Sequence, residues 1–311
     1  MPLNFNDKDK KTVSKSIDKS EEKRDDFFSV TEPLYCFDQI VLTEHIKKEL
    51  ESVLYFYKNE EKIFTEWGMN EVFPNRKNLV INLYGESGTG KTMTAHALAN
   101  SLGKKLVIID YSSIESKYVG ETSKNLVKAF EYAKENGAVL FFDEADALLS
   151  KRVTDMSSST DISVNQTKSV LLGLLNNYSE MVIFTTNFIT NYDTAFMRRI
   201  QYHIKYELPD VDQRRVIWKK YIPTKLPTDI DIDNLAHKYE GVSGSDIANA
   251  VFKAVVRAAN NSEFLVRNSY FSEEIEKIIV SKQDNRGNVT VTTREVSEEY
   301  ALEQIERSKG K

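Results

Sequence analysis

Short apolar runs alternate with amphipathic stretches along the first two thirds of the chain. The runs are rich in β-branched and aromatic residues, which predicts buried strands. Five runs fit this description: Leu79–Tyr84, Leu106–Ile109, Val139–Phe142, Met181–Phe184 and the weaker His203–Leu208. Four stretches before or between them have helical spacing: Ile40–Phe64, Met93–Leu102, Ser123–Glu135 and Gln166–Asn176. This alternation predicts βα units and a parallel sheet, with strands covered on both faces.

The pattern divides the chain into three regions. Fourteen of the first 26 residues are charged, with mixed signs, and such a segment cannot bury enough apolar surface to order itself. Beyond Leu208 the pattern is mostly helical, in four segments: Arg214–Tyr221, Ile232–Tyr239, Ser245–Ala259 and Ser297–Ile305. We therefore expect a flexible charged arm over 1–33, an α/β domain over 34–208 and a helical domain over 209–311.

Composition narrows the classes of function. The net charge is −5, which disfavours a non-specific nucleic-acid binder, because such proteins need a cationic surface. Cys36 is the one cysteine, so an intrachain disulfide is excluded, and the four histidines lack metal-ligand spacing. The longest apolar runs are too short for a membrane span, and the polar N-terminus shows no secretory signal. These features predict a cytoplasmic protein without a membrane span.

A phosphate-binding loop follows the first predicted strand of the sheet. Residues 85–92 read Gly-Glu-Ser-Gly-Thr-Gly-Lys-Thr, the P-loop pattern, and a helical stretch comes directly after them. Glycines let backbone amides curve around phosphate oxygens, and the helix N-terminus adds its dipole. The predicted nucleotide-binding residues here are Gly85, Glu86, Ser87, Gly88, Thr89, Gly90, Lys91 and Thr92. Lys91 is placed to reach the β and γ phosphates, and Thr92 to coordinate Mg²⁺.

Two acidic residues end the strand Val139–Phe142. A buried strand of a parallel sheet delivers Asp143 and Glu144 to the edge where ligands bind in open α/β folds. We predict that Asp143 belongs to the Mg²⁺ shell and that Glu144 orients and deprotonates the attacking water. The four residues 143–146 also spell the tetrapeptide of DEAD-box helicases. Those enzymes need a second α/β domain, whereas the second part of this chain is helical.

Polar residues after the next strand complete the predicted catalytic set. Asn187 ends the run that begins at Met181, where its amide can contact the γ-phosphate or the lytic water. Arg198 and Arg199 follow at the spacing expected for an arginine finger, a cation that stabilises charge during phosphoryl transfer.

Together these motifs resemble the AAA family of the AAA+ superfamily over roughly residues 37–259. The P-loop and Asp143-Glu144 match Walker A and Walker B, Asn187 matches sensor 1, and the paired arginines resemble those of the katanin and spastin group. The resemblance implies that Ile40 lies beside the adenine, and that Gly244 and Ser245 close over the nucleotide. The implied fold is an AAA+ module, a P-loop sheet between helices followed by a small helical lid.

The segment around Tyr118 resembles the first pore loop of this family. Lys117, Tyr118, Val119 and Gly120 have its aromatic–aliphatic–glycine pattern, and the polar stretch 151–167 has the position of a second pore loop. In the family, such aromatics line the channel of a ring and grip an extended polypeptide. The resemblance thus implies a hexamer that binds a protein substrate, with target choice made by the arm, by surface loops or by an adaptor protein.

We therefore expect a ring-forming ATPase that uses ATP and Mg²⁺ to remodel, unfold or disassemble a protein. One alternative is a nucleic-acid-linked ATPase switch of the loader type, which would not need Tyr118. A second is a nucleotide-gated scaffold that does not hydrolyse ATP, for which Glu144, Asn187 and the arginines would be superfluous.

Overall fold

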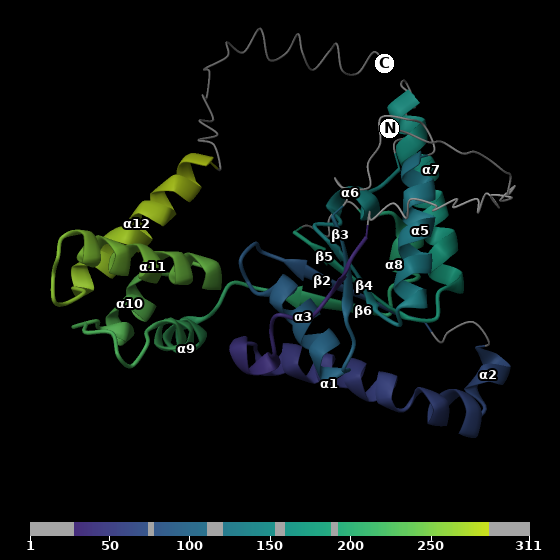
Figure 1. Ribbon diagram of the computed structural model, residues 1–311, viewed down its shortest axis with the longest axis horizontal. Helices are drawn as coiled ribbons and strands as arrows, with labels where there is room; N and C mark the ends of the chain where they lie inside the picture. Colours follow the sequence, from purple (N-terminus) through teal and green to yellow (C-terminus); the bar gives the residue numbers. More distant parts are fainter. Residues whose placement is uncertain (1–27, 74–77, 111–120, 153–158, 188–191, 286–311) are drawn as a thin grey trace, which may run out of the picture.

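The computed structural model describes residues 28–73, 78–110, 121–152, 159–187 and 192–285 (Figure 1). In these residues the strands form one six-stranded sheet in the order β1-β3-β4-β5-β2-β6. The strands are β1 (Val30–Thr31), β2 (Leu79–Gly85), β3 (Leu106–Asp110), β4 (Val139–Asp143), β5 (Met181–Thr186) and β6 (Tyr202–Tyr206). Neighbouring strands are parallel except that β1 pairs antiparallel with β3. The predicted α/β fold with a parallel sheet is confirmed.

Helices cover both faces of this sheet. The longer ones are α1 (Glu44–Lys58), α3 (Lys91–Ser101), α5 (Glu121–Glu135) and α7 (Ser159–Asn177). Short turns of helix complete the layers: η1 (Phe37–Gln39), η2 (Lys62–Glu66), α2 (Met69–Val72), α6 (Asp146–Leu149) and α8 (Thr194–Met197). In β2, Val80 belongs to the core beneath α5 and α7, whereas Leu79 and Ile81 belong to the core beneath α1 and α3. Because both faces of β2 are covered, its first five residues are all buried, which explains its apolar run.

The structure differs from the sequence prediction at two elements, the strand β1 and the start of helix α7. Val30 and Thr31, which we had assigned to the N-terminal arm, form the edge strand β1 opposite Val107 and Leu106. A strand of two residues has too few positions for alternation to be visible. Helix α7 begins at Ser159 instead of Gln166. The sequence pattern did not indicate this start, because the two apolar residues of its first two turns, Ile162 and Val164, are two positions apart and lack helical spacing.

The chain continues from β6 into a group of four helices within the described residues. They are α9 (Val211–Tyr221), α10 (Ile232–Lys238), α11 (Gly244–Asn260) and α12 (Asn268–Asn285). Their shared core centres on Trp218 and Phe271, whose rings meet edge to face with centroids 6.3 Å apart. Helix α12 was not predicted, and the helix predicted over 297–305 lies outside the described residues. None of the described helices has the length and apolar character that crossing a membrane requires.

Candidate nucleotide-binding site

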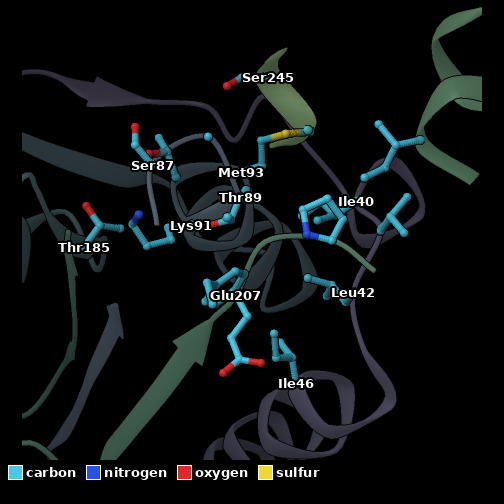
Figure 2. Close-up of a pocket in the computed structure, with 18 of the residues that line it drawn as sticks. Ile40, Leu42, Ile46, Ser87, Thr89, Lys91, Met93, Thr185, Glu207 and Ser245 are labelled. Atoms are coloured by element: carbon cyan, nitrogen blue, oxygen red, sulfur yellow. The ribbon is translucent and has the colours of Figure 1, made fainter. Parts of the chain in front are cut away.

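A cavity of about 290 Å³ lies at the carboxyl ends of the central strands, between the sheet and the first turn of α11. Figure 2 shows Ile40, Leu42 and Ile46 on one side of it, and Ser87, Lys91 and Thr185 on the other. Twelve of the predicted site residues line it: Ile40, Ser87, Gly88, Thr89, Gly90, Lys91, Thr92, Asp143, Glu144, Asn187, Gly244 and Ser245. The cavity thus has an apolar end suited to a base and a polar end suited to phosphates.

The loop between β2 and α3 is shaped by three glycines with positive φ. These angles are +134° at Gly85, +75° at Gly88 and +101° at Gly90. At Gly85 the backbone lies so close to β6 that a Cβ would approach the carbonyl oxygen of Tyr206 to 1.9 Å. Gly90 precedes the first residue of α3, so the helix N-terminus, with its unpaired amides, opens towards the cavity. The loop therefore has the geometry of an anion-binding site.

Lys91 is buried at the base of this loop. Its Nζ donates hydrogen bonds to the carbonyl oxygens of Gly85 at 2.7 Å and Glu86 at 2.9 Å, and to Asn187 Oδ1 at 3.1 Å. Burial lowers the pKa of the ammonium, and the charge of the nearby Asp146 carboxylate opposes this shift. All three donors of the ammonium are thus engaged, and contact with a phosphate requires it to exchange at least one partner.

Thr92 and Asp143 bring hard oxygen atoms together beside the loop. The Thr92 hydroxyl donates to the Asp143 carboxylate at 3.2 Å, and Thr185 Oγ1 donates to Asp143 Oδ1 as well. In the part of the chain that is described, no cluster of three His, Cys, Asp or Glu side chains could hold a metal by itself. A hydroxyl and one carboxylate suit Mg²⁺, which usually binds through one or two protein oxygens together with phosphates and waters.

Glu144 has a backbone conformation that is rare for a residue with a Cβ. Its φ is +51°, and its N–H donates to Thr185 Oγ1 at 3.1 Å. A left-handed residue other than glycine costs free energy and persists only where its surroundings hold it. This conformation turns the chain after β4 and leaves the Glu144 side chain exposed at the cavity, where it can meet a water molecule.

Two residues of this site were missed at the level of sequence. Asp146 accepts the backbone N–H of Asn187 at 3.0 Å and so holds the end of β5 beside the end of β4. Thr185 connects Asp143 with the backbone of Glu144 through one hydroxyl. Both have a signal in the sequence, because each lies within two residues of a predicted site residue at a strand end.

The two arginines lie away from this cavity. Among the described residues that line it, neither Arg198 nor Arg199 occurs. Arg199 forms hydrogen bonds within its own chain: its guanidinium donates to Asn176 Oδ1 at 2.8 Å and to the Ala195 carbonyl at 2.9 Å. Arg198 is exposed.

The predicted pore loop cannot be located in this structure. Lys117, Tyr118, Val119 and Gly120 lie outside the described residues, as does most of the first half of the polar stretch 151–167. The chain resumes at Glu121, where α5 begins.

The fold and the phosphate loop define an α/β P-loop domain. Residues 81–208 match the family described as "ATPase family associated with various cellular activities (AAA)". Over these residues the chain is similar to AAA-family ATPases, the resemblance that its motifs predicted.

Several archaeal proteins are similar to this chain. The chain is 29% identical over 257 residues to a putative 26S proteasome regulatory subunit homolog of Methanothermobacter marburgensis, covering 81% of this chain and 66% of the relative. Identity to Cell division protein C of Sulfolobus acidocaldarius is 31% over 242 residues, with coverage of 75% and 62%. Identity to the proteasome-activating nucleotidase of Methanopyrus kandleri is 28% over 289 residues, with coverage of 90% and 62%. The chain spans less than two thirds of the length of each relative.

Proposed function

We propose that this chain is a ring-forming ATPase that hydrolyses ATP to remodel, unfold or disassemble a protein. The observation that carries the proposal is that Lys91, Thr92, Asp143, Glu144 and Asn187 meet at one cavity. The names of two relatives, proteasome-activating nucleotidase and proteasome regulatory subunit homolog, support a role in acting on proteins.

The phosphate loop would bind the nucleotide through backbone amides and Lys91. The start of α3 lines the cavity, where its amides would bind phosphate oxygens, and the buried ammonium would supply a positive charge for the β and γ phosphates. Ile40 and Leu42 would cover one side of the adenine, with Gly244 and Ser245 from α11 on the other side of the cavity. Closing the site in this way excludes water from the phosphates.

Thr92 and Asp143 would hold Mg²⁺, since their oxygens are already within hydrogen-bond distance of one another. When bound, the metal neutralises charge on the phosphates during transfer. Thr185 fixes the Asp143 carboxylate by a hydrogen bond, which keeps this carboxylate oriented.

Glu144 would act as the general base. Its carboxylate accepts a proton from the attacking water, and its fixed backbone determines where that water lies. Asn187, which now accepts a hydrogen bond from Lys91, would turn its amide towards the γ-phosphate or this water when the ammonium changes partners.

We infer that hydrolysis needs a second subunit, because neither Arg198 nor Arg199 lines the cavity of its own chain. A finger raises the rate of phosphoryl transfer by ~10³–10⁵, which corresponds to roughly 4–7 kcal/mol. The adjacency of Arg198 and Arg199 is the feature that supports a likeness to the katanin and spastin group. A hexamer is the ring we propose, acting in the cytoplasm with a protein substrate and, for target choice, an adaptor protein.

Residues 34–208 would form the ATPase subdomain, residues 209–311 the lid and residues 1–33 an arm. The lid supplies Gly244 and Ser245 to the cavity. Tyr118 would grip the substrate through its flat ring, which packs against many kinds of side chain.

The decisive experiment removes the general base and the finger separately. Glu144→Gln should bind ATP with unchanged affinity in calorimetry and hydrolyse it at least ~10²-fold more slowly. Glu51→Gln, an exposed change on α1, is the matched control and should leave turnover unchanged. Subunits with both Arg198→Ala and Arg199→Ala, mixed with Glu144→Gln subunits, should regain part of the activity. A proven monomer with full, concentration-independent activity would overturn the proposal.

A further inference from the structure

Residues 34–42 lie between the α/β domain and the lid, and we name them the 34–42 strap. The first part of the strap is fixed to α3. The Leu34 N–H donates to His96 Nδ1 at 3.2 Å, and Asn100 Nδ2 donates to the Tyr35 carbonyl oxygen at 3.2 Å. The start of the strap is therefore anchored on the helix that follows the phosphate loop.

The second part of the strap contacts both the lid and the nucleotide-binding cavity. Ile40, Val41 and Leu42 all line the cavity. Val41 packs against the lid core around Trp218, whereas Leu42 packs against the core beneath α1 and α3. The Ile40 side chain lies close to the phosphate loop, because a Cβ at Gly90 would be 3.4 Å from Ile40 Cγ2. The strap thus forms one wall of the cavity and reaches the lid at Val41.

Lys220 joins the lid to this strap. Its Nζ donates a hydrogen bond to the carbonyl oxygen of Asp38. Lys220 belongs to the last turn of α9 and lines the cavity together with Gln213, Ile217 and Tyr221. These positions recur every three or four residues, so one face of α9 forms a second wall of the cavity. The bond from Lys220 therefore connects two walls of the same cavity, and its charged donor makes it stronger than a bond between neutral groups.

The acceptor of this bond has a fixed direction, because Asp38 lies inside the short helical turn η1. Gln39 Oε1 accepts the Cys36 N–H at 2.9 Å, and the Ile40 N–H donates to the Phe37 carbonyl oxygen at 3.0 Å. Phe37 also packs against the core beneath α1 and α3. Since the turn is closed in this way, the bond restrains the position of α9 relative to the strap.

A lysine at this place has a simpler explanation, since positive charge near the C-terminus of a helix interacts favourably with the helix dipole. That explanation applies equally to Lys219 and Lys220, which both lie in the last turn of α9 and are both exposed. Of these two lysines, however, Lys220 lines the cavity and Lys219 does not. The helix dipole therefore does not explain the contact between Lys220 and Asp38.

We propose that Lys220 is a positioning residue that slows the release of ADP, because it ties α9 to the 34–42 strap beside the cavity. This role rests on the proposed binding of ATP at that cavity. A base that is held between Ile40 and α9 leaves only when these two walls separate, and the bond from Lys220 to Asp38 opposes their separation. Lys220 thus affects product release without touching the phosphates.

The test measures the release of ADP from the full chain in the presence of Mg²⁺, so that turnover does not enter. Bound radiolabelled ADP is chased with an excess of unlabelled ADP. Lys220→Met should raise the rate constant of release about fivefold, a moderate effect because water screens an exposed lysine. Lys220→Arg, which keeps a charged donor, should restore slow release. Lys219→Met is the matched control, because it removes the same charge from the same helix end, and it should leave the rate unchanged.

Two outcomes of this comparison would overturn the inference while the proposed ATPase stands. One is that Lys219→Met accelerates release as much as Lys220→Met, which would make the charge at the helix end the cause. The other is that Lys220→Met releases ADP like the unchanged chain. An unchanged chain that binds no ADP would instead overturn the proposed nucleotide site together with the role of Lys220.

A cross-link tests the same contact in the opposite direction. In a Cys36→Ser chain, Asp38→Cys and Lys220→Cys can be joined by a short bismaleimide, which replaces the hydrogen bond by a covalent connection. Release of ADP should be fast before the reaction and slower than in the unchanged chain after it. Equal rates before and after complete cross-linking would show that α9 and the strap need not separate, and would overturn the inference.

Discussion

The backbone N–H of Ser245 donates a hydrogen bond to the carbonyl oxygen of Gly88 at 3.2 Å. This bond joins the first turn of α11 to the middle of the phosphate loop. Ser243, the N-cap of the same helix, is held by a capping box with Asp246, so the helix end that meets the loop is well defined. A change in the conformation of the phosphate loop at Gly88 would therefore alter its contact with the first turn of α11.

Gly88→Ala should weaken both the lid contact and nucleotide binding. A Cβ at Gly88 would lie 2.1 Å from Ser245 Oγ and 2.6 Å from Ser243 Oγ, in addition to the strain of a φ of +75°. Gly103→Ala is the matched control, because its φ of +63° carries similar strain but no atom lies within 4 Å. We expect at least a tenfold loss of ATP affinity in calorimetry for Gly88→Ala alone. Equal affinities for the two variants would show that the lid contact is unimportant for binding.

Arg198→Ala and Arg199→Ala should separate catalysis from structure. As the proposed arginine finger, Arg198 should contribute ~10³ or more to kcat, and Arg198→Ala should lose this contribution. Because the Arg198 side chain is exposed, the same change should leave the melting temperature unchanged. Arg199 connects α8 with α7 through Asn176, so Arg199→Ala should lower the melting temperature by several degrees. Steady-state hydrolysis and thermal unfolding of both variants check this. A larger loss of kcat in a well-folded Arg199→Ala would reverse the assignment.

Tyr118→Ala should separate protein remodelling from ATP hydrolysis. Tyr118 is outside the described residues, and its change leaves Lys91, Thr92 and Glu144 intact. We expect unchanged ATP binding and most of the basal hydrolysis, with loss of unfolding of a tagged model substrate. Tyr118→Phe should retain unfolding, since the ring matters more than the hydroxyl. Full unfolding activity in Tyr118→Ala would show that Tyr118 does not grip the substrate.

Acidification should destabilise the protein through His96. The Leu34 N–H donates to His96 Nδ1 at 3.2 Å, and burial lowers the pKa of this imidazole below its ordinary value of 6.5. As the pH falls through 6.5, the unfolded chain takes up a proton that the folded chain does not, so the free energy of unfolding decreases. The free energy of unfolding continues to decrease until the pH reaches the pKa of His96 in the folded protein.

Urea unfolding at pH 7.5 and 5.5 measures this dependence. His96→Asn keeps an acceptor for the Leu34 N–H but does not titrate. This variant should be less stable at both values yet lose less stability between them. His203, whose pKa burial also lowers, is common to both proteins and cancels in the comparison. Identical pH dependence in the two proteins would exclude His96 as the source.

The strands could be predicted from sequence because burial on both faces leaves a continuous apolar run. β2, β4 and β5 were each located to within two residues. Helix α12 was missed although Phe271, Ile275 and Ile279 repeat every four residues along one face, and a search for that period beyond residue 260 would have found it.

The phosphate loop and the two acids after β4 could also be predicted, because local spacing alone determines their chemistry. The contact between Asp146 and the Asn187 backbone could not be predicted from the sequence. It joins residues 41 positions apart, and only the order of β4 and β5 in the sheet brings them together.

Gly85 lies against Tyr206, so the base of the phosphate loop packs directly on the end of β6. Tyr206 ends β6, and α9 begins at Val211 behind its Asp210 cap, so only residues 207–209 separate the strand from the capped helix. Pro209 further restricts this connection, because its ring fixes φ. The connection between the sheet and α9–α12 is therefore short and lies beside the base of the phosphate loop. A rotation of a few degrees within residues 207–209 would displace α12 further than α9, as the far end of a lever moves further than its near end.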